Sequence, residues 1–575
     1  MGPPRDEPHH HPKPEKLERA EPIDELENAL KSVMKIYVTL VEPDYTQPWT
    51  VFMEEECTGS GFAIDVGELV IVTNAHVVAS HADIRIRKFG QVHKWKARSL
   101  VIAHTADVAL LAVEDARFWK GVEPLEFGDL PRLYETVKCV GYTMGGDNAC
   151  VTRGVVSRVD TTSYVRGAEQ LLVVQIDAAI NSGNSGGPAL DDNSRVAGVA
   201  FSGYAGTADN IGYIIPRVVV SNVVDEYLKT KKWAGLCNLG ISTQSCENPA
   251  LRKRLKMDDV TGVLVTRVAA LGCCAKAGVK AGDVLISLDS VSVANDGTVP
   301  LRGSERVHAD HLVTSKLSGK EIDVEILRDG DAIRLRATLS PLPRLVPLVD
   351  GFDADPAYVV VGGLVLMALS VPLISAMSDD DDDSFDLRFA DYLEKDKAEP
   401  DAQIVVWTQT LSHDVNFGYN QLCHHLPRLH RLNSEPVKSL AHVVSMTATP
   451  AQSSTTFWEF EFLPPGGASP VLVVVDAEAS QAAEPALLKR SKVPAPYSPD
   501  LKLTKPKPRR PRNRNKHHHP PKKSPKNHAD STTADATTTS SSGDPPATTA
   551  GEGGPPPKQQ QQQQQQQQNG TDDTT

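Results

Sequence analysis

The 575-residue sequence lacks the cysteine patterns that mark zinc sites and disulfide frameworks. Its eight cysteines form no C-x-x-C pair and follow no regular spacing, so they predict free thiols in a reducing compartment. Residues 1–22 contain no apolar core of a secretory signal, and their acidic residues disfavour an organelle transit peptide. They also fail the myristoylation pattern, because Asp6 stands where Ser or Thr is needed. These absences predict a cytosolic or nuclear protein.

The charge is segregated along the chain. The formal charge of −13 argues against a wholly nucleic-acid-binding protein, yet basic residues crowd the proline-broken segment 502–526. This segment predicts a nuclear or nucleolar import signal, with a partnerless solvated tail as the alternative. It lacks interleaved aromatic residues that would stack on bases, which disfavours direct nucleic-acid binding. Low-complexity sequence follows, so we expect 501–575, like 1–22, to be disordered. The expected location is the nucleus, and the cytoplasm is the alternative.

The apolar pattern divides the rest of the chain into three units. Short β-rich runs punctuated by glycine fill residues 23–232 and predict a mainly β barrel or sandwich pair, with a helix near 217–231. Two mixed units follow, at 236–342 and 356–500. We therefore expect an all-β domain followed by two smaller α+β domains.

One stretch, Tyr358–Ser375, is long enough to raise the question of a membrane span. It carries no charge over eighteen residues. The pair Gly362–Gly363 and Pro372 break it into pieces of strand length, and an acidic run follows it directly. We expect buried strands here and no membrane span.

The segment at 181–188, NSGNSGGP, has the composition of a nucleophilic turn. Glycines on both sides of Ser185 allow a tight turn in which backbone N–H groups converge on one point. Gly183, Asn184 and Ser185 are the expected oxyanion-hole residues, with Gly183 and Ser185 as the principal donors. The alternative for this segment alone is a glycine-rich hairpin.

Two other segments supply the partners that such a serine needs. His76 stands at the end of an apolar strand, and Asp107 lies at the mouth of another apolar run. A lone buried carboxylate is costly unless paired, and an imidazole N–H is a suitable partner. The order His76, Asp107, Ser185 is that of the chymotrypsin-type double barrel. The three residues predict acyl transfer by a catalytic triad, with no metal ion and no cofactor.

On these residues the chain resembles the HtrA/Deg (Do-like) serine proteases. It looks most like the plant Deg branch that has nuclear or nucleolar members. The resemblance implies a trypsin-like domain at 23–232 followed by two PDZ domains, assembled as a homotrimer or a multiple of it. It also implies ATP-independent cleavage of unfolded or regulatory proteins after small or aliphatic residues. The segments that carry it are GSGFAI (59–64), TNAHVV (73–78), HTADVALLAV (104–113), GDNACVTRGVVSRV (146–159), QIDAAINSGNSGGPAL (175–190) and DNIGYIIP (209–216).

The resemblance extends to the two later units. In 236–342 the motif AGVKAGDVLISLDSVSV (277–293) resembles an HtrA PDZ domain, in which Leu239, Gly240 and Ile241 would form the loop that binds peptide C-termini. The unit at 356–500 resembles the divergent second PDZ domain of plant Deg proteins.

The sequence departs from the family at two places near the nucleophile. Ser182 stands where the family usually has proline. After Gly141-Tyr142 the family commonly has another proline, where this chain has Thr143-Met144. Proline presets the backbone angles, so both changes predict looser loops around the oxyanion hole. They leave open a second reading, a proteolytically weak chaperone or peptide-binding adaptor. An alternative on specificity is that Asp177 or Asp209 selects basic residues.

Overall fold

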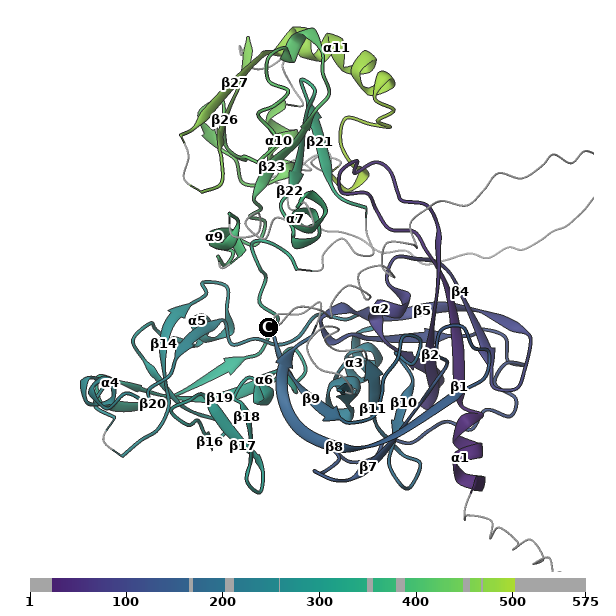
Figure 1. Cartoon of the computed structure of the whole chain (residues 1–575). Helices are drawn as coiled ribbons and strands as arrows, with labels where there is room; N and C mark the ends of the chain where they lie inside the picture. Colours follow the sequence, from purple (N-terminus) through teal and green to yellow (C-terminus); the bar gives the residue numbers. More distant parts are fainter. Residues whose placement is uncertain are drawn as a thin grey trace, which may run out of the picture. The chain divides into compact units, whose positions relative to one another are not determined.

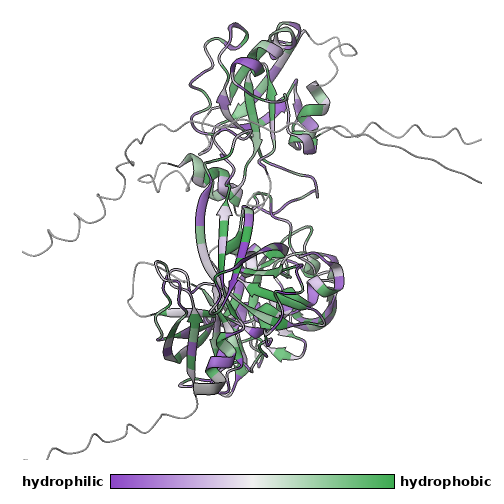
Figure 2. Ribbon diagram, turned by 90° about the vertical axis from the view of Figure 1, so that its right-hand side faces the viewer, coloured by the Kyte–Doolittle hydropathy of each residue, from purple (hydrophilic) through white to green (hydrophobic). Residues whose placement is uncertain are grey.

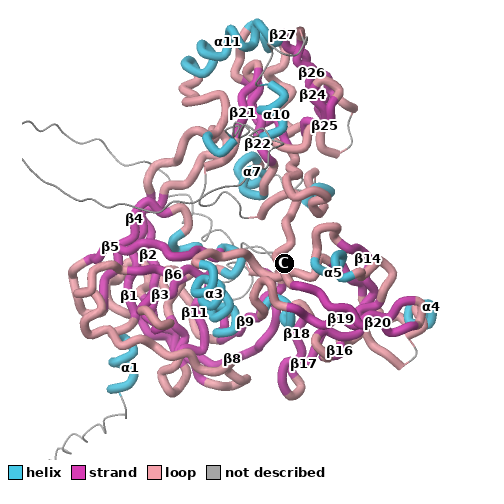
Figure 3. The backbone as a smooth tube through the Cα atoms, turned by 180° about the vertical axis from the view of Figure 1, so that it is seen from behind, coloured by secondary structure: helices cyan, strands magenta, loops and turns pink. Residues whose placement is uncertain are grey.

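The structure is a computed structural model, and it is mainly β (Figure 3). The described residues form two closed six-stranded barrels and, after them, a six-stranded, a two-stranded and a seven-stranded sheet. Figure 1 labels their elements. The two barrels confirm the predicted double-barrel fold. The structure describes residues 23–164, 169–201, 211–257, 259–348, 355–378, 388–393, 395–447, 456–466 and 469–501.

The first barrel closes in the strand order β1-β2-β3-β6-β5-β4, with every neighbouring pair antiparallel. Strands β3 and β6 are apolar along almost their whole length, whereas β4 alternates in part, and the apolar side chains fill the interior. Its elements are α1 (Ile23–Leu30), β1 (Val33–Leu40), β2 (Glu55–Asp65), β3 (Leu69–Thr73), α2 (Ala75–Val78), β4 (His81–Lys88), β5 (Lys94–Ala103), η1 (His104–Ala106) and β6 (Val108–Ala112).

The second barrel closes in the order β10-β11-β12-β9-β8-β7. The expected helix follows it as α3, whose apolar side packs into a hydrophobic cluster that includes residues of both barrels. Its elements are β7 (Thr136–Gly141), β8 (Cys150–Ser163), β9 (Gln170–Ile176), β10 (Pro188–Leu190), β11 (Val196–Phe201), β12 (Gly212–Pro216) and α3 (Arg217–Thr230).

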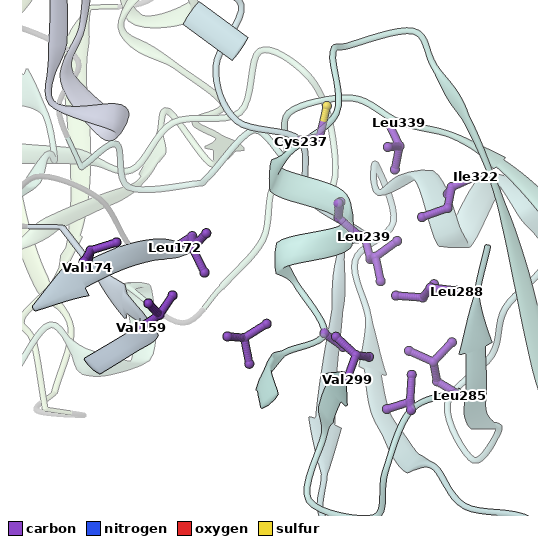
Figure 4. Close-up of a cluster of buried hydrophobic side chains, with 14 of the residues drawn as sticks. Val159, Leu172, Val174, Cys237, Leu239, Leu285, Leu288, Val299, Ile322 and Leu339 are labelled. Carbon is purple, nitrogen blue, oxygen red and sulfur yellow. The ribbon is translucent and has the colours of Figure 1, made fainter. Parts of the chain in front are cut away.

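The unit at 236–342 is an antiparallel sheet in the order β13-β14-β15-β19-β20, with a separate hairpin β17-β18. Its labelled apolar side chains, among them Leu285, Leu288 and Ile322, converge in its interior (Figure 4). Its elements are β13 (Ile241–Gln244), α4 (Pro249–Arg254), β14 (Val263–Val268), α5 (Cys273–Ala277), β15 (Val284–Leu288), β16 (Val291–Ser292), β17 (Thr298–Arg302), β18 (Glu305–His308), α6 (His311–Thr314), β19 (Glu321–Arg328) and β20 (Asp331–Thr338).

The last unit is a sheet in the order β21-β22-β23-β24-β26-β27, with β25 paired to β24. Its elements are β21 (Tyr358–Val361), β22 (Leu364–Ala368), α7 (Val371–Met377), α9 (Ala390–Leu393), β23 (Val405–Thr410), η2 (Asp414–Asn416), β24 (Arg428–Leu432), β25 (Glu435–Pro436), α10 (Leu440–Thr447), β26 (Phe457–Leu463), β27 (Val471–Asp476), α11 (Ala477–Arg490) and η4 (Pro499–Leu501).

The uncharged stretch 358–375 forms β21, β22 and the start of α7, as expected. Both strands are almost completely buried, and the turn between them uses Gly362 and Gly363 at positive φ. Among the described helices, none combines the length and the apolar character needed to cross a membrane. Figure 2 shows hydrophobic and hydrophilic residues mixed along the strands of the chain. The residues of β21 and β22 belong to two buried hydrophobic clusters, so this stretch is apolar because it lies inside a domain.

Candidate active site

The first barrel brings His76 and Asp107 together. Strand β3 ends at Thr73 and the short helix α2 follows, which places His76 one turn beyond the strand. The His76 Nδ1 atom lies 2.8 Å from Oδ2 and 3.0 Å from Oδ1 of Asp107, and the His76 backbone N–H donates to Oδ1 at 3.0 Å. A carboxylate at Nδ1 favours the tautomer with the proton on that nitrogen. The Nε2 lone pair is therefore available as a base.

Asp107 is held in a backbone conformation that non-glycine residues seldom adopt. Its φ is +49°, it ends the η1 turn, and its N–H donates to His104 O at 3.2 Å. The Asn74 side chain donates to the Asp107 carbonyl at 2.9 Å. The side chain of His76 is 35% exposed and that of Asp107 is 12% exposed. The carboxylate is thus sheltered while the imidazole reaches solvent, as a general base requires.

Ser185 lies in the turn before β10, against the first barrel. The Ser60 N–H on β2 donates to the Ser185 carbonyl at 2.9 Å, and Gly186 N donates to Ala200 O at 2.9 Å. Gly186 has φ of +84°, and a Cβ there would lie 2.2 Å from Ser60 O and 2.3 Å from Thr73 Oγ1. Only glycine allows this close approach between the turn and the end of β3.

The serine turn and the histidine helix meet around Gly59. A Cβ at Gly59 would lie 2.6 Å from Val77 Cγ1, next to His76, and 3.4 Å from the Ser185 carbonyl. The three expected triad residues are therefore gathered in one region of the two barrels. No hydrogen bond joins Ser185 Oγ to His76 within the described parts of the chain. In the absence of substrate, the donor–acceptor distance of a catalytic hydrogen bond of this kind often exceeds hydrogen-bonding range.

The expected oxyanion-hole residues divide into two kinds. The Asn184 N–H already donates to Asn181 O at 3.0 Å, so it is not available to an oxyanion. Gly183 N and Ser185 N donate to no other described residue. They are therefore the two donors that the turn leaves open. Gly183 has φ of +99°, which glycine adopts without strain.

Ser60 fixes this turn from the opposite barrel, and the sequence analysis did not single it out. Its buried hydroxyl donates to Gly183 O at 2.6 Å and accepts from Tyr142 N at 2.8 Å. A hydroxyl that donates once and accepts once satisfies both groups. The GSGFAI motif contained the signal, since a serine between two glycines in a buried strand needs a polar partner.

Asp177, one of the two residues considered for basic specificity, is engaged elsewhere. Its Oδ1 accepts from the Val155 N–H on β8 at 2.5 Å, and a Cβ at Gly154 would lie 2.4 Å from the same oxygen. Asp209 lies outside the described residues.

The expected peptide-binding loop precedes the edge strand β13. Gly240 has φ of +72° and a Cβ there would lie 2.7 Å from Gly272 Cα, so the position requires glycine. Its N–H donates to Asn238 Oδ1 at 2.7 Å, whereas Leu239 and Gly240 each accept from the backbone through their carbonyls. Among the described strands, β13 pairs with β14 alone and stands at the end of its sheet, the position where PDZ domains add a peptide strand.

With a carboxylate-bound histidine on one six-stranded barrel and a serine in a glycine turn on the other, the fold places this chain among the trypsin-like serine proteases. Comparison with known families agrees: the trypsin-like peptidase domain matches residues 59–199. A PDZ domain matches residues 346–500, a range that contains the unit at 356–500 predicted to be the divergent second PDZ domain.

Curated relatives narrow the class to a family. The chain is 39% identical to Protease Do-like 2, chloroplastic, of Arabidopsis thaliana, over 82% of this chain and 75% of the relative. It is 36% identical to Protease Do-like 4, mitochondrial, of the same plant, over 73% and 77%. The chain belongs to the Do-like (HtrA/Deg) family of serine proteases. Among solved structures it is similar to the HtrA-type protease AlgW with tripeptide, at a TM-score of 0.44 and 23% identity, over 55% of this chain and 98% of that chain.

Proposed function

We propose that the protein is an ATP-independent endopeptidase that hydrolyses unfolded or regulatory proteins through an acyl-enzyme on Ser185. The observation that carries this proposal is the Asp107 carboxylate bound to His76 Nδ1 at 2.8 Å, which leaves Nε2 free as a base. Peptide hydrolysis is exergonic, so the mechanism needs no nucleotide.

Each residue has a defined role in the proposed reaction. His76 Nε2 takes the proton of Ser185 Oγ as the oxygen attacks the scissile carbonyl, and Asp107 stabilises the resulting imidazolium. Gly183 N and Ser185 N bind the oxyanion of the tetrahedral intermediate. His76 then returns the proton to the leaving amine. Water enters by the same steps and releases the acyl product.

The substrate class rests on apolar surroundings and on the later domains. Strand β11 contacts the serine turn through the bond from Gly186 N to Ala200 O. It is buried along its whole length, and none of its residues is acidic. This supports cleavage after small or aliphatic residues. We propose that the unit at 236–342 is also a PDZ domain, which binds peptide C-termini through Leu239, Gly240 and Ile241, the peptide carboxylate replacing Asn238 Oδ1 as the acceptor of the Gly240 N–H.

A second candidate is the proteolytically weak chaperone or adaptor. The missing hydrogen bond between Ser185 Oγ and His76 among the described residues favours it, as do Ser182 and Thr143. A serine-reactive fluorophosphonate separates the two, because only an activated serine is labelled. Labelling of the wild type that is lost in Ser185→Ala supports the protease, and an unlabelled wild type supports the adaptor.

Degradation of unfolded β-casein without ATP tests the proposed activity. We expect fragments from the wild type and none from Ser185→Ala, and mass spectrometry of the fragments gives the residue preference. If neither protein cleaves casein, even when warmed or given C-terminal peptides, the endopeptidase proposal is wrong.

Location and assembly are further parts of the proposal. We propose a nuclear or nucleolar location directed by the basic segment 502–526, and a homotrimer or a multiple of it. Deleting 502–526 from a fluorescent fusion should move it to the cytoplasm, and sedimentation analysis gives the oligomer mass. A fusion whose location does not change on deletion would contradict the first point.

A further inference from the structure

The loop between β7 and β8 is tied to the first barrel by two cations. Lys35, on β1, donates from Nζ to Gly146 O at 2.7 Å and to Asp147 Oδ1 at 3.2 Å. Arg87, on β4, donates from one guanidinium nitrogen to Asp147 O at 2.6 Å and to Asp147 Oδ1 at 3.0 Å. Each cation therefore holds both the loop backbone and the same carboxylate.

The burial of the two cations makes this contact specific. The side chains of Lys35 and Arg87 are only 7% and 10% exposed, whereas that of Asp147 is 72% exposed. Buried charges need partners, and one carboxylate is shared between two cations, so the loop carbonyls complete their coordination. The hydrogen bond from Arg87 lowers the pKa of the Asp147 carboxyl most, and the hydrogen bond from Lys35 lowers it further. The Tyr37 ring lies within 6 Å of both cations and adds a cation–π contact.

The same loop contacts the peptide that supplies an oxyanion donor. Met144 N donates to Ser182 O at 3.0 Å, and a Cβ at Gly183 would lie 2.3 Å from Tyr142 O and 2.9 Å from Met144 N. The Ser182 carbonyl and the Gly183 N–H belong to one planar trans peptide and point in opposite directions. Holding the carbonyl toward Met144 therefore keeps the N–H of Gly183 turned away from the loop.

We propose that Lys35, Arg87 and Asp147 are positioning residues for the oxyanion hole. They fix the loop whose Met144 N–H orients the Ser182–Gly183 peptide. The inference rests on the proposed endopeptidase function. It gives Gly146 and Asp147, the first two residues of the GDNACV segment, a role in positioning the oxyanion hole. This role depends on their contact with Lys35, which lies 112 residues before Asp147 in the sequence.

Asp147→Ala tests this role, because the side chain is exposed and its loss leaves no cavity. Asp115→Ala is the control, since Asp115 is a half-buried aspartate (35% exposed) paired with Arg117 at 2.6 Å, in the segment that follows β6. We would measure kcat and KM on a nitroanilide peptide from a mapped casein cleavage site. The affinity of the matching peptide boronate, which binds Ser185 as a transition-state analogue, is the second readout.

We expect Asp147→Ala to lower kcat and the boronate affinity together by about 10-fold, below the 10²–10³ typical of losing a whole oxyanion donor, with KM changed less than about 2-fold. Asp147→Asn, which keeps one carbonyl acceptor, should recover part of the loss. Because Asp147→Ala removes the carboxylate that two largely buried cations share, its thermal midpoint should lie below that of Asp115→Ala, so kinetics are recorded well below both midpoints.

The proposal is overturned if kcat and boronate affinity of Asp147→Ala match those of Asp115→Ala, or if only KM rises. A wild type that neither turns over the peptide nor binds the boronate overturns the proposed function, and the positioning role with it. The two failures are distinct, because the first requires an active wild type.

Discussion

The two halves of the active site are stabilised in opposite ways. In the first barrel the base is complete: the two oxygens of Asp107 face His76, and Asn74 and the η1 turn hold the Asp107 backbone. In the second barrel the Gly183–Ser185 turn keeps two N–H groups unused and is held by Ser60 from outside. The base is thus built by its own barrel, whereas the oxyanion hole depends on contacts across the two barrels.

The largest effect on kcat is expected in the first barrel, where the His76–Asp107 pair is already formed. Asp107→Asn keeps the shape but presents an amide that favours the wrong His76 tautomer. We expect kcat to fall about 10⁴-fold with the fold retained. Steady-state kinetics and circular dichroism check this. A loss below about 10-fold would show that Asp107 does not orient the base.

The next effect lies on the turn. Gly183→Ala places a Cβ against Tyr142 O, which is backbone and cannot yield, at a residue with φ of +99°. We expect kcat to fall about 10²–10³-fold, as for the loss of one oxyanion donor. Gly67→Ala is the control, because Gly67, between β2 and β3, also has positive φ (+92°) but its Cβ would meet nothing within 4 Å. Equal losses in the two variants would point to general backbone strain.

A smaller effect is expected for Ser60→Ala. The change leaves Gly183 O and Tyr142 N without a partner, which costs about 1–3 kcal/mol of unfolding free energy for buried groups. We expect kcat to fall about 10-fold or more, since the turn loosens without losing a donor. Ser99→Ala, on β5 of the same barrel, should change neither. Chemical denaturation and kinetics give both quantities, and an unchanged kcat would remove Ser60 from the site.

The smallest expected effect is on the pH dependence of the Asp147 contact. The pKa of Asp147 is lowered in the folded protein. The stabilisation that its carboxylate gives the loop is therefore complete above the pKa of an aspartate in the unfolded chain, about 3.9, and is lost as the pH falls through the lower pKa of the folded protein. The kcat ratio of wild type to Asp147→Ala should therefore stay constant from about pH 5 to pH 9. A ratio that falls toward 1 near pH 6 would contradict this assignment of charge.

The sequence predicted what is encoded locally. Glycine turns, apolar strands and the order of His76, Asp107 and Ser185 indicated the double barrel, and the trypsin-like match at 59–199 agrees. The PDZ expectation is confirmed at 346–500, while that at 236–342 stays a prediction. The basic segment 502–526 and the two expected disordered tails fall outside the described residues, except for Leu501, which ends η4.

Contacts between distant segments could not be predicted. Ser60 and Gly183 are 123 residues apart, and no periodicity relates them. The hydrogen bond from Met144 N to Ser182 O links the two departures from the family and has no signal in the sequence, while looser loops at these positions stay a prediction. The Asn184 amide had been grouped with the donors, but its bond to Asn181 depends on the three-dimensional turn.

The most direct test measures the His76–Asp107 pair and the oxyanion hole separately in one variant. In Ser60→Ala we would record the proton resonance of His76 Nδ1–H and the affinity for the peptide boronate. Independent halves predict an unchanged resonance with boronate affinity lowered about 10-fold. A resonance that shifts together with the affinity would show that base and oxyanion hole form one unit and would contradict the account.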